Sequence, residues 1–184
     1  MTYRCLNFDN YALKTLYLAD MMKIKDWRNA QMNVLRQNVV LTDETQENYY
    51  LNIIVPSYQA KEPQILVFGF RFHDYLIGYG GLTNIDWKSK RAEVSFLIDT
   101  ARTINIEQYC IDFEMFLKII KSFAFIELKI NRLFTETYAN RPFHVEVLER
   151  NGFKHEGRLK QHVYIDGIFI DSLIHGCLKE CKDV

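Results

Sequence analysis

The segment from residue 91 to residue 138 constrains the fold more than any other part of the sequence. Residues 107–125 carry apolar side chains at a 3.6-residue spacing, which predicts a helix with one buried face. This stripe consists of Tyr109, Cys110, Phe113, Phe116, Leu117, Ile120, Phe123 and Ala124. Residues 91–99 before the helix alternate as a strand does, and residues 131–138 after it also have strand character. A strand, a helix and a strand in this order predict two parallel strands joined by a right-handed crossover.

The other segments extend this unit into one mixed α/β layer. Thr42 suits a helix N-cap, Pro56 is expected to end that helix, and Gly152 suits the end of another. Asp166-Gly167 between two strand-like runs is a strong hairpin signal. We expect strands at residues 3–8, 64–72, 75–83, 161–165 and 168–178, and helices at residues 10–37 (with a break near Trp27), 42–55 and 141–151.

Composition limits the classes of protein that this chain can belong to. With 184 residues, a single domain spanning 1–184 is expected, and it is large enough to bury a core without metal or disulfides. Lys+Arg and Asp+Glu both number 23, so the net charge is zero, which argues against nucleic-acid and membrane partners. Four scattered cysteines are typical of reduced thiols, and no apolar run is long enough to span a membrane. A cytoplasmic location is therefore the default expectation.

Several common catalytic motifs do not occur in the sequence. It contains no G-x-S-x-G elbow, no Walker A loop, no H-E-x-x-H and no G-x-G-x-x-G. The five histidines lack the spacing of metal ligands, so we predict no metal site and interpret each histidine as a surface or core residue. The glycine-rich run at residues 78–81 is interpreted as a place where strands approach closely.

The C-terminal third carries the most informative pattern. Residues 140–159 contain Asn-Arg-Pro-Phe-His-Val-Glu-Val-Leu-Glu-Arg-Asn-Gly-Phe-Lys-His-Glu-Gly-Arg-Leu, and Asp-Gly-Ile-Phe-Ile-Asp follows at residues 166–171. Together with Trp-Arg-Asn at 27–29 and Arg-Ala-Glu-Val-Ser-Phe at 91–96, this pattern resembles the GNAT acetyltransferase superfamily. The branch that it resembles contains the ribosomal-protein alanine N-acetyltransferases, and the pattern is also similar to enzymes that acetylate nucleotide-linked amino sugars.

The resemblance implies a fold and a cosubstrate. It implies a single mixed, mostly antiparallel α/β (α+β) sheet with helices on both faces, in which two central parallel strands splay apart to admit acetyl-CoA. These strands correspond to residues 91–99 and 131–138. Free backbone groups of Phe96, Leu97 and Ile98 are then expected to pair with the pantetheine arm, where an N–H group polarises the thioester carbonyl. Asn140 matches an asparagine that the family uses near this arm, and a helix N-cap is its alternative role.

The expected phosphate loop departs from the family pattern. Members of the family usually open the helix at 107–125 with a glycine-rich turn, whose backbone N–H groups and helix N-terminus bind the pyrophosphate. Here no glycine occurs between Gly81 and Gly152. The corresponding CoA-binding residues are Arg102, Thr103, Ile104, Asn105 and Ile106. Either the two polar side chains at 102 and 103 compensate by direct contact, or tight CoA binding is lost.

Two carboxylates are candidates for the catalytic base that deprotonates the attacking amine. Glu93 lies on the strand expected to hold the thioester, and a partner for Arg91 or a lysine is its alternative role. Glu136, on the neighbouring strand, is the second candidate, with a structural role as the alternative. Many family members carry an acid tyrosine four residues before Gly-Phe, where this sequence has Leu148.

We assign three further residues to the acceptor side. Trp27 and Arg28 are candidates for the acceptor pocket, where an arginine can bind a phosphate or carboxylate. Their alternative roles are packing on the sheet and solvation. Asp171 matches a late aspartate of the family and either faces the acceptor or anchors a strand end.

The sequence therefore predicts an acetyl-CoA-dependent N-acetyltransferase. The expected acceptor is a small-molecule amine, with an amino sugar slightly favoured over a protein N-terminus. The alternatives are a GNAT-fold binding module without catalysis and an acyltransferase that uses a carrier protein or another acyl-CoA. The aromatic content of 14% leaves room for a homodimer face.

Overall fold

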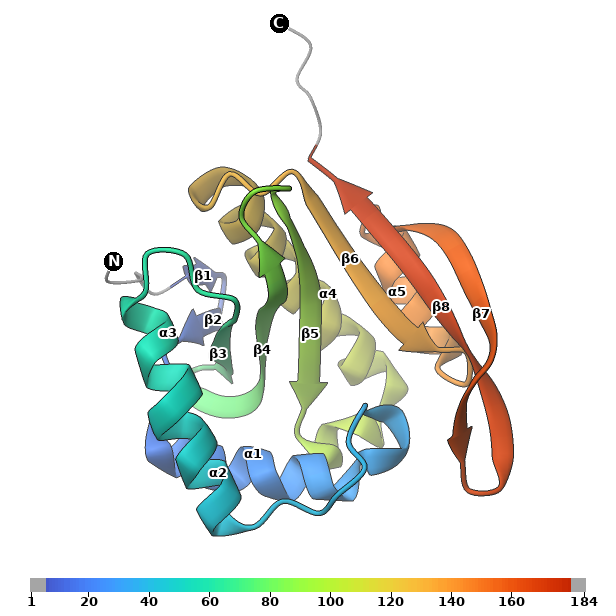
Figure 1. Ribbon diagram of the computed structural model, residues 1–184, viewed down its shortest axis with the longest axis horizontal. Coiled ribbons are helices and arrows are strands. Elements are labelled where there is room, and N and C mark those ends of the chain that lie inside the picture. The colour runs from blue at the N-terminus through green and yellow to red at the C-terminus, as the bar shows by residue number, and fades with distance from the viewer. Residues whose placement is uncertain (1–5, 180–184) are drawn as a thin grey trace, which may run out of the picture.

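The computed structural model describes residues 6–179, in which eight strands form one sheet. Their spatial order is β1-β2-β3-β4-β5-β6-β8-β7 (Figure 1). The strand bounds are Leu6–Phe8 (β1), Tyr11–Lys14 (β2), Leu66–Phe72 (β3), Tyr75–Asp86 (β4), Arg91–Ile98 (β5), Arg132–Tyr138 (β6), Lys154–Ile165 (β7) and Ile168–Leu178 (β8). Neighbouring strands pair antiparallel except β5 and β6, which pair parallel. The predicted fold class is confirmed.

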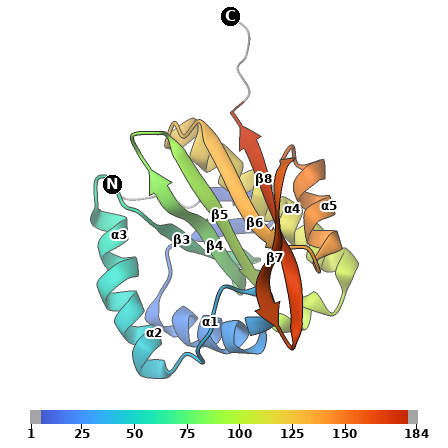
Figure 2. The ribbon, with the colours of Figure 1, turned by 45° about the vertical axis from the view of Figure 1, so that its right-hand side comes forward.

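Helices cover both faces of this sheet, as Figures 1 and 2 show. One face carries α1 (Leu18–Ala30), α2 (Asp43–Tyr49) and α3 (Val55–Gln59), and the other carries α4 (Ile106–Ser122) and α5 (Pro142–Arg150). Because successive side chains of a strand point to opposite faces, Val67 and Phe68 of β3 belong to different apolar clusters. Val67 packs in the cluster of α1, whereas Phe68 packs in the larger cluster beneath α4.

The N-terminal half differs from the predicted elements in two places. The helix expected at residues 10–37 is a strand, β2, followed by α1, and α1 continues through Trp27 without a break. The reason is tertiary, because residues 11–14 pair with both β1 and β3 and are held in the sheet between them. The helix that begins after Thr42 does not end at Pro56. A π-helical turn at Tyr50–Ile54 widens the backbone just before the proline, and α3 continues beyond it.

The glycine-rich run of β4 lies where strands and α4 approach one another closely. A Cβ on Gly80 would stand 2.3 Å from the carbonyl oxygen of Ser95 on β5 and 2.8 Å from the ring of Phe116 on α4. No side chain fits at this position. The interpretation of this run as a site of close strand approach is therefore confirmed.

The parallel pair β5–β6 is short and then separates. Its only paired positions are Arg91–Arg132, Ala92–Leu133 and Glu93–Phe134. Beyond Glu93 and Phe134, β5 continues to Ile98 and β6 to Tyr138 without pairing to each other. The two strands thus diverge in the middle of the sheet, which is the predicted splay.

The β7–β8 hairpin is longer than the predicted one and extends away from the body of the molecule (Figures 1 and 2). The predicted first strand, 161–165, is the distal end of β7, which begins at Lys154. A bulge between Leu159 and Val163 divides β7. Asp166 and Gly167 have φ angles of 50° and 83° at the tip, as the predicted tight turn requires.

Candidate active site

A cavity of about 220 Å³ lies where β5 and β6 have separated. Residues 93–96 of β5 and residues 135–138 of β6 form its walls. The helices α4 and α5 contribute Phe113 and His144, and the segment after α1 contributes residues 34–36. Because its lining comes from elements on both faces of the sheet, this cavity, here called the wedge, connects the α1 side with the α4 side.

Unpaired backbone groups of β5 face the wedge. The N–H of Asp99 donates to the carbonyl of Ile77 at 2.8 Å, so this residue directs its backbone groups to β4. In an antiparallel ladder these directions alternate, and the pairing of β4 with β5 is regular from Gly78 to Thr83. Leu97 and Ser95 therefore also address β4, whereas Phe96 and Ile98 address the β6 side. Phe96 lines the wedge, and the Ile98 carbonyl accepts from Gln31 Nε2 at 2.9 Å. Of the three residues predicted to pair with pantetheine, Leu97 is directed away from the gap.

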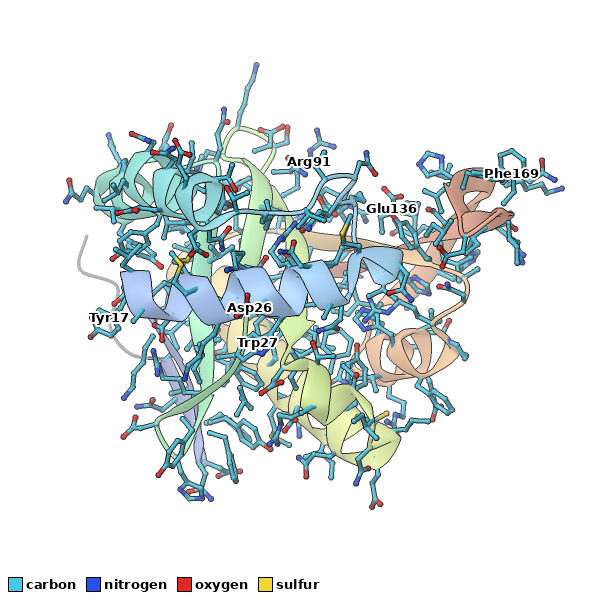
Figure 3. All side chains as sticks on the ribbon, turned by 90° about the horizontal axis from the view of Figure 1, so that it is seen from below. Tyr17, Asp26, Trp27, Arg91, Glu136 and Phe169 are labelled. Carbon is cyan, nitrogen blue, oxygen red and sulfur yellow. The ribbon has the colours of Figure 1, made fainter. Side chains whose placement is uncertain are left out.

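The two candidate bases lie on the same face of the sheet, on either side of the wedge. Glu93 is 4% exposed and Glu136 is 16% exposed. The guanidinium of Arg36 joins them, because it pairs with Glu93 Oε1 and its Nη1 lies 3.6 Å from Glu136 Oε2. Figure 3 shows Glu136 beside the segment that follows α1, which carries this arginine. Arg91, which was the alternative partner expected for Glu93, pairs with Asp86 instead, so that expectation is wrong.

A bulge in β4 supplies a second partner for Glu93. The register between β4 and β5 shifts between Thr83 and Asp86, and Asn84 in this bulge has a φ angle of 48°. Its Nδ2 donates to Glu93 Oε2 at 2.6 Å. The carboxylate is therefore fixed from both sides, by an amide within the sheet and by an arginine above it.

The Trp-Arg-Asn motif builds the roof of the wedge. Trp27 is buried in the apolar cluster of α1, so its side chain packs on the sheet. Arg28 lines the wedge, and its guanidinium donates to the hydroxyl of Tyr79 and to Gln37 Oε1. Asn29 exchanges two hydrogen bonds with the backbone of Leu41, each 2.9 Å long. These contacts hold the segment that carries Arg36 against α1.

A second cavity, of about 580 Å³, adjoins the wedge on the α4 side. It lies between the end of α1, the 3-10 turn Thr100–Thr103, and the N-terminal ends of α4 and α5. Both cavities are lined by Val34, Arg141 and His144. Asn140 lines the second cavity as well, together with Ile106 and Tyr109. An elongated ligand can therefore reach the wedge past the N-terminus of α4.

The predicted phosphate loop borders this second cavity, but its arginine is engaged elsewhere. Arg102 forms a two-pronged ion pair with Asp112, with N–O distances of 2.6 and 2.9 Å. The carboxylate of Asp112 is fully buried and also accepts from Tyr11 and Gln108. Arg102 thus serves to neutralise a buried charge.

The other loop residues have local roles. Thr103 donates to the carbonyl of Thr100, and Asn105 caps α4 by accepting from the Gln108 N–H. Ile104 is 84% exposed, and Ile106, which is 45% exposed, borders the second cavity. Because the Asn105 cap uses only one of the orphan N–H groups of the first turn, others are left for an anion.

A network of three side chains, two of them buried, lies between the two cavities. Arg141 Nη2 donates to the Tyr109 hydroxyl at 2.8 Å, and that hydroxyl lies 2.6 Å from His144 Nδ1. The His144 ring stacks on Phe113 with centroids 4.1 Å apart. Burial lowers the pKa of His144 well below its usual value and raises that of Tyr109, so both groups are neutral. A neutral imidazole that accepts from Tyr109 at Nδ1 carries its proton on Nε2.

The fold and this geometry agree with the comparisons to known proteins. The sequence matches the family described as acetyltransferase (GNAT) domain over residues 13–174. The chain belongs to the GNAT acetyltransferase family. It is therefore an acyltransferase of the N-acetyltransferase class. No curated protein matches the sequence significantly.

Solved structures of GNAT enzymes share the fold. The spermidine N-acetyltransferase of Vibrio cholerae in complex with CoA and spermine is 20% identical, with 93% of this chain and 96% of that chain covered and a TM-score of 0.75. The RimL ribosomal L7/L12 α-N-protein acetyltransferase in complex with CoA is 14% identical, with 95% and 98% covered and a TM-score of 0.78. At these identities the likeness concerns the fold.

Two residues that the GNAT resemblance singled out have defined places in the structure. Asn140 is not a helix N-cap, because Arg141 occupies that position of α5 without a side-chain cap. Asp171 accepts from the Gln161 N–H at 2.6 Å and from Arg158 Nε at 2.5 Å, and these two bonds lower the pKa of its carboxyl. It thereby anchors the bulge of β7 against β8.

The structure adds site residues that the sequence reasoning did not identify. Arg36 and Asn84 lie outside the motifs, Arg141 lies within the 140–159 pattern but has no role assigned from it, and His144 is one of the five histidines expected to be surface or core residues. For Arg141 and His144, the only signal in the sequence is their position at the start of the helix that follows the splayed strand β6. Within residues 6–179 no cluster of metal-ligating side chains occurs, and none of the described helices could span a membrane.

Proposed function

We propose that this GNAT protein transfers the acetyl group of acetyl-CoA to a primary amine, with an amino sugar slightly favoured over a protein N-terminus. The observation that carries the proposal is the splay itself. Strands β5 and β6 stop pairing at Glu93 and Phe134, and the cavity that opens there is bordered by two carboxylates. A thioester on one side and an amine on the other can meet only where the sheet is open.

The residues present fit an acetyl-CoA arm. Phe96 directs its backbone groups into the gap, and the Ile98 N–H faces the same side, as the antiparallel register requires, while the Ile98 carbonyl accepts from Gln31. The N-terminus of α4 and Arg141 border the larger cavity, where a pyrophosphate would find N–H donors and a cation. When bound, acetyl-CoA supplies the thioester whose acyl carbon is attacked. The backbone N–H of Phe96 is our candidate for polarising its carbonyl.

Glu93 is our candidate for the base that deprotonates the amine. An ammonium that binds at its carboxylate gives up one proton there, directly or through a water, and the free amine attacks the acyl carbon. The C–N bond forms and the C–S bond breaks, and the nitrogen loses a second proton as the amide forms. Glu136 lies on the other side of the wedge and provides a second carboxylate for the same ammonium.

The leaving sulfur needs a proton, and a phenol along the wedge can supply it. Leu148, where many members carry a tyrosine, is fully buried in the core. The wedge is instead lined by the phenol of Tyr138. Burial, the largest cause, and the nearby Glu136 raise the pKa of Tyr138, so its hydroxyl stays protonated.

Thermal unfolding and thiol release together test the proposal. Saturating acetyl-CoA or CoA should stabilise the protein, by about 2.7 kcal/mol at 100 times the dissociation constant. Addition of an amine panel should then release one CoA thiol per amide formed. The absence of any shift in Tm at millimolar CoA would count against the proposal. A shift without thiol release from any amine would favour a binding module instead.

A further inference from the structure

Arg36 occupies the position that an acceptor ammonium needs. Its guanidinium pairs with Glu93 and reaches Glu136, the two carboxylates that border the wedge. The side chain of Arg36 is 55% exposed, whereas that of Glu93 is 4% exposed. An arriving cation can therefore displace the arginine outward, but it cannot draw the carboxylate away from the sheet.

A second arginine leaves a positive charge uncompensated at the same place. Arg28 lines the wedge and bonds to neutral partners, the Tyr79 hydroxyl and the Gln37 amide oxygen. No carboxylate of residues 6–179 forms an ion pair with it. Arg141 lines the wedge as well, so three arginines face two glutamates there, and a polycation gains little by entering.

We infer that Arg36 is a specificity-determining latch that selects primary amines carrying an oxyanion, a phosphate or a carboxylate, close to the amino group. The ammonium of such an acceptor replaces the guanidinium at Glu93. The displaced Arg36 then pairs with the oxyanion of the acceptor, and Arg28 provides a second donor. This inference rests on the proposed function and specifies its substrate class.

The order of charges explains the selection. With an oxyanion-bearing amine bound, the charges alternate along the wedge from Glu93 to the ammonium, the oxyanion and Arg36. Each charge then lies next to a charge of the opposite sign, and every buried charge keeps a partner. A polyamine would instead place a further cation beside Arg36 and Arg28. A monoamine without an oxyanion would leave the displaced guanidinium with only Glu136.

An acceptor panel with four amines tests the latch. The panel contains a nucleotide-linked amino sugar for the phosphate, β-alanine for the carboxylate, ethanolamine as a monoamine without an oxyanion, and spermidine as a polyamine. We expect kcat/KM for at least one oxyanion-bearing amine to exceed those for ethanolamine and spermidine by about tenfold or more, the usual size of a charge-assisted contact. Comparison of the nucleotide-linked amino sugar with β-alanine shows whether the preferred oxyanion is a phosphate or a carboxylate.

Arginine variants locate the selection. Arg36→Gln should remove most of that preference, and Arg36→Lys, which keeps the charge, should retain part of it. The matched control is Arg150→Gln, because Arg150 is also half-exposed (53%) and pairs with a glutamate on the outer side of α5. This control should keep the preference. Calorimetric binding of the preferred amine to the CoA-bound protein should weaken in parallel by about tenfold for Arg36→Gln.

The outcomes distinguish failure of the latch from failure of the proposed function. Turnover of all four amines without preference, or a preference for spermidine, overturns the latch and leaves the acetyltransferase function standing. An unchanged preference in folded Arg36→Gln overturns it as well. If neither stabilisation by CoA nor turnover of any amine is seen, the proposed function fails and the latch fails with it.

Discussion

Replacing Glu93 with glutamine should abolish most turnover while leaving the protein folded and able to bind CoA. The substitution keeps the shape of the side chain and the hydrogen bond from Asn84, but it removes the proton acceptor and the charge that holds Arg36. Loss of a general base typically lowers kcat by about 10²–10⁴. We therefore expect a decrease of at least about a hundredfold in kcat/KM for the preferred amine.

The structure also limits the accompanying loss of stability. Losing a hydrogen bond to a charged group costs about 1.5–3 kcal/mol, but Arg36 is more than half exposed, so about 1 kcal/mol is realistic. For a chain of this size that lowers Tm by about 2–4 °C. The stabilisation by CoA should be unchanged, because Glu93 directs no group toward the second cavity.

The pH dependence and a matched variant sharpen this test. Activity of Glu93→Gln should recover partly at alkaline pH, where the acceptor is already a neutral amine and needs no base. Glu136→Gln, which removes the other carboxylate of the wedge, should reduce turnover less. If Glu93→Gln retains wild-type turnover at neutral pH, the assignment is refuted, and a larger loss in Glu136→Gln would transfer the role to that residue.

Three further predictions concern stability. Burial lowers the pKa of His144 well below 6.5, so the unfolded chain binds a proton that the folded protein excludes. As the pH falls below about 6.5, the free energy of unfolding should therefore decrease by up to about 1.4 kcal/mol per pH unit. His144→Asn should flatten this slope in urea titrations, and an unchanged slope would contradict the prediction. Gly80→Ala should cost about 1–3 kcal/mol in the same assay, because its Cβ meets the Ser95 carbonyl at 2.3 Å, and a neutral result would show that β4 can shift. Asp112→Asn should lower the free energy of unfolding by about 3–5 kcal/mol, because it leaves Arg102 without its counter-charge. A loss below about 1 kcal/mol would mean that solvent already screens the pair.

The central part of the fold could be predicted because its signals are local. The apolar stripe of α4 has the helical period, and the strands on either side alternate, so the parallel pair followed from the chain alone. The strand β2 could not be predicted in this way. Its four residues, Tyr11–Lys14, suit a helix or a strand equally, and only pairing with β3 decides between them.

The site was less predictable because its contacts join distant parts of the chain. Glu93 and Glu136 were identified from their strands, but the arginine between them lies 57 residues from the first in sequence. The place of Arg102 in the loop predicts a phosphate contact. Its actual partner is the buried Asp112, 10 residues later in α4, and no local signal marks that pair. His144 carries no ligand-like spacing, and only the stack on Phe113 places it between the cavities.

Amide hydrogen exchange on β5, with and without acetyl-CoA, tests the central claim most directly. In the free protein, the Ser95 and Leu97 amides should be protected by β4, and the Phe96 and Ile98 amides should exchange faster because they face the open side of the strand. Acetyl-CoA should slow exchange selectively at Phe96 and Ile98. Equal protection of all four amides in the free protein, or no slowing on addition of acetyl-CoA, would contradict a cosubstrate that binds between the separated strands.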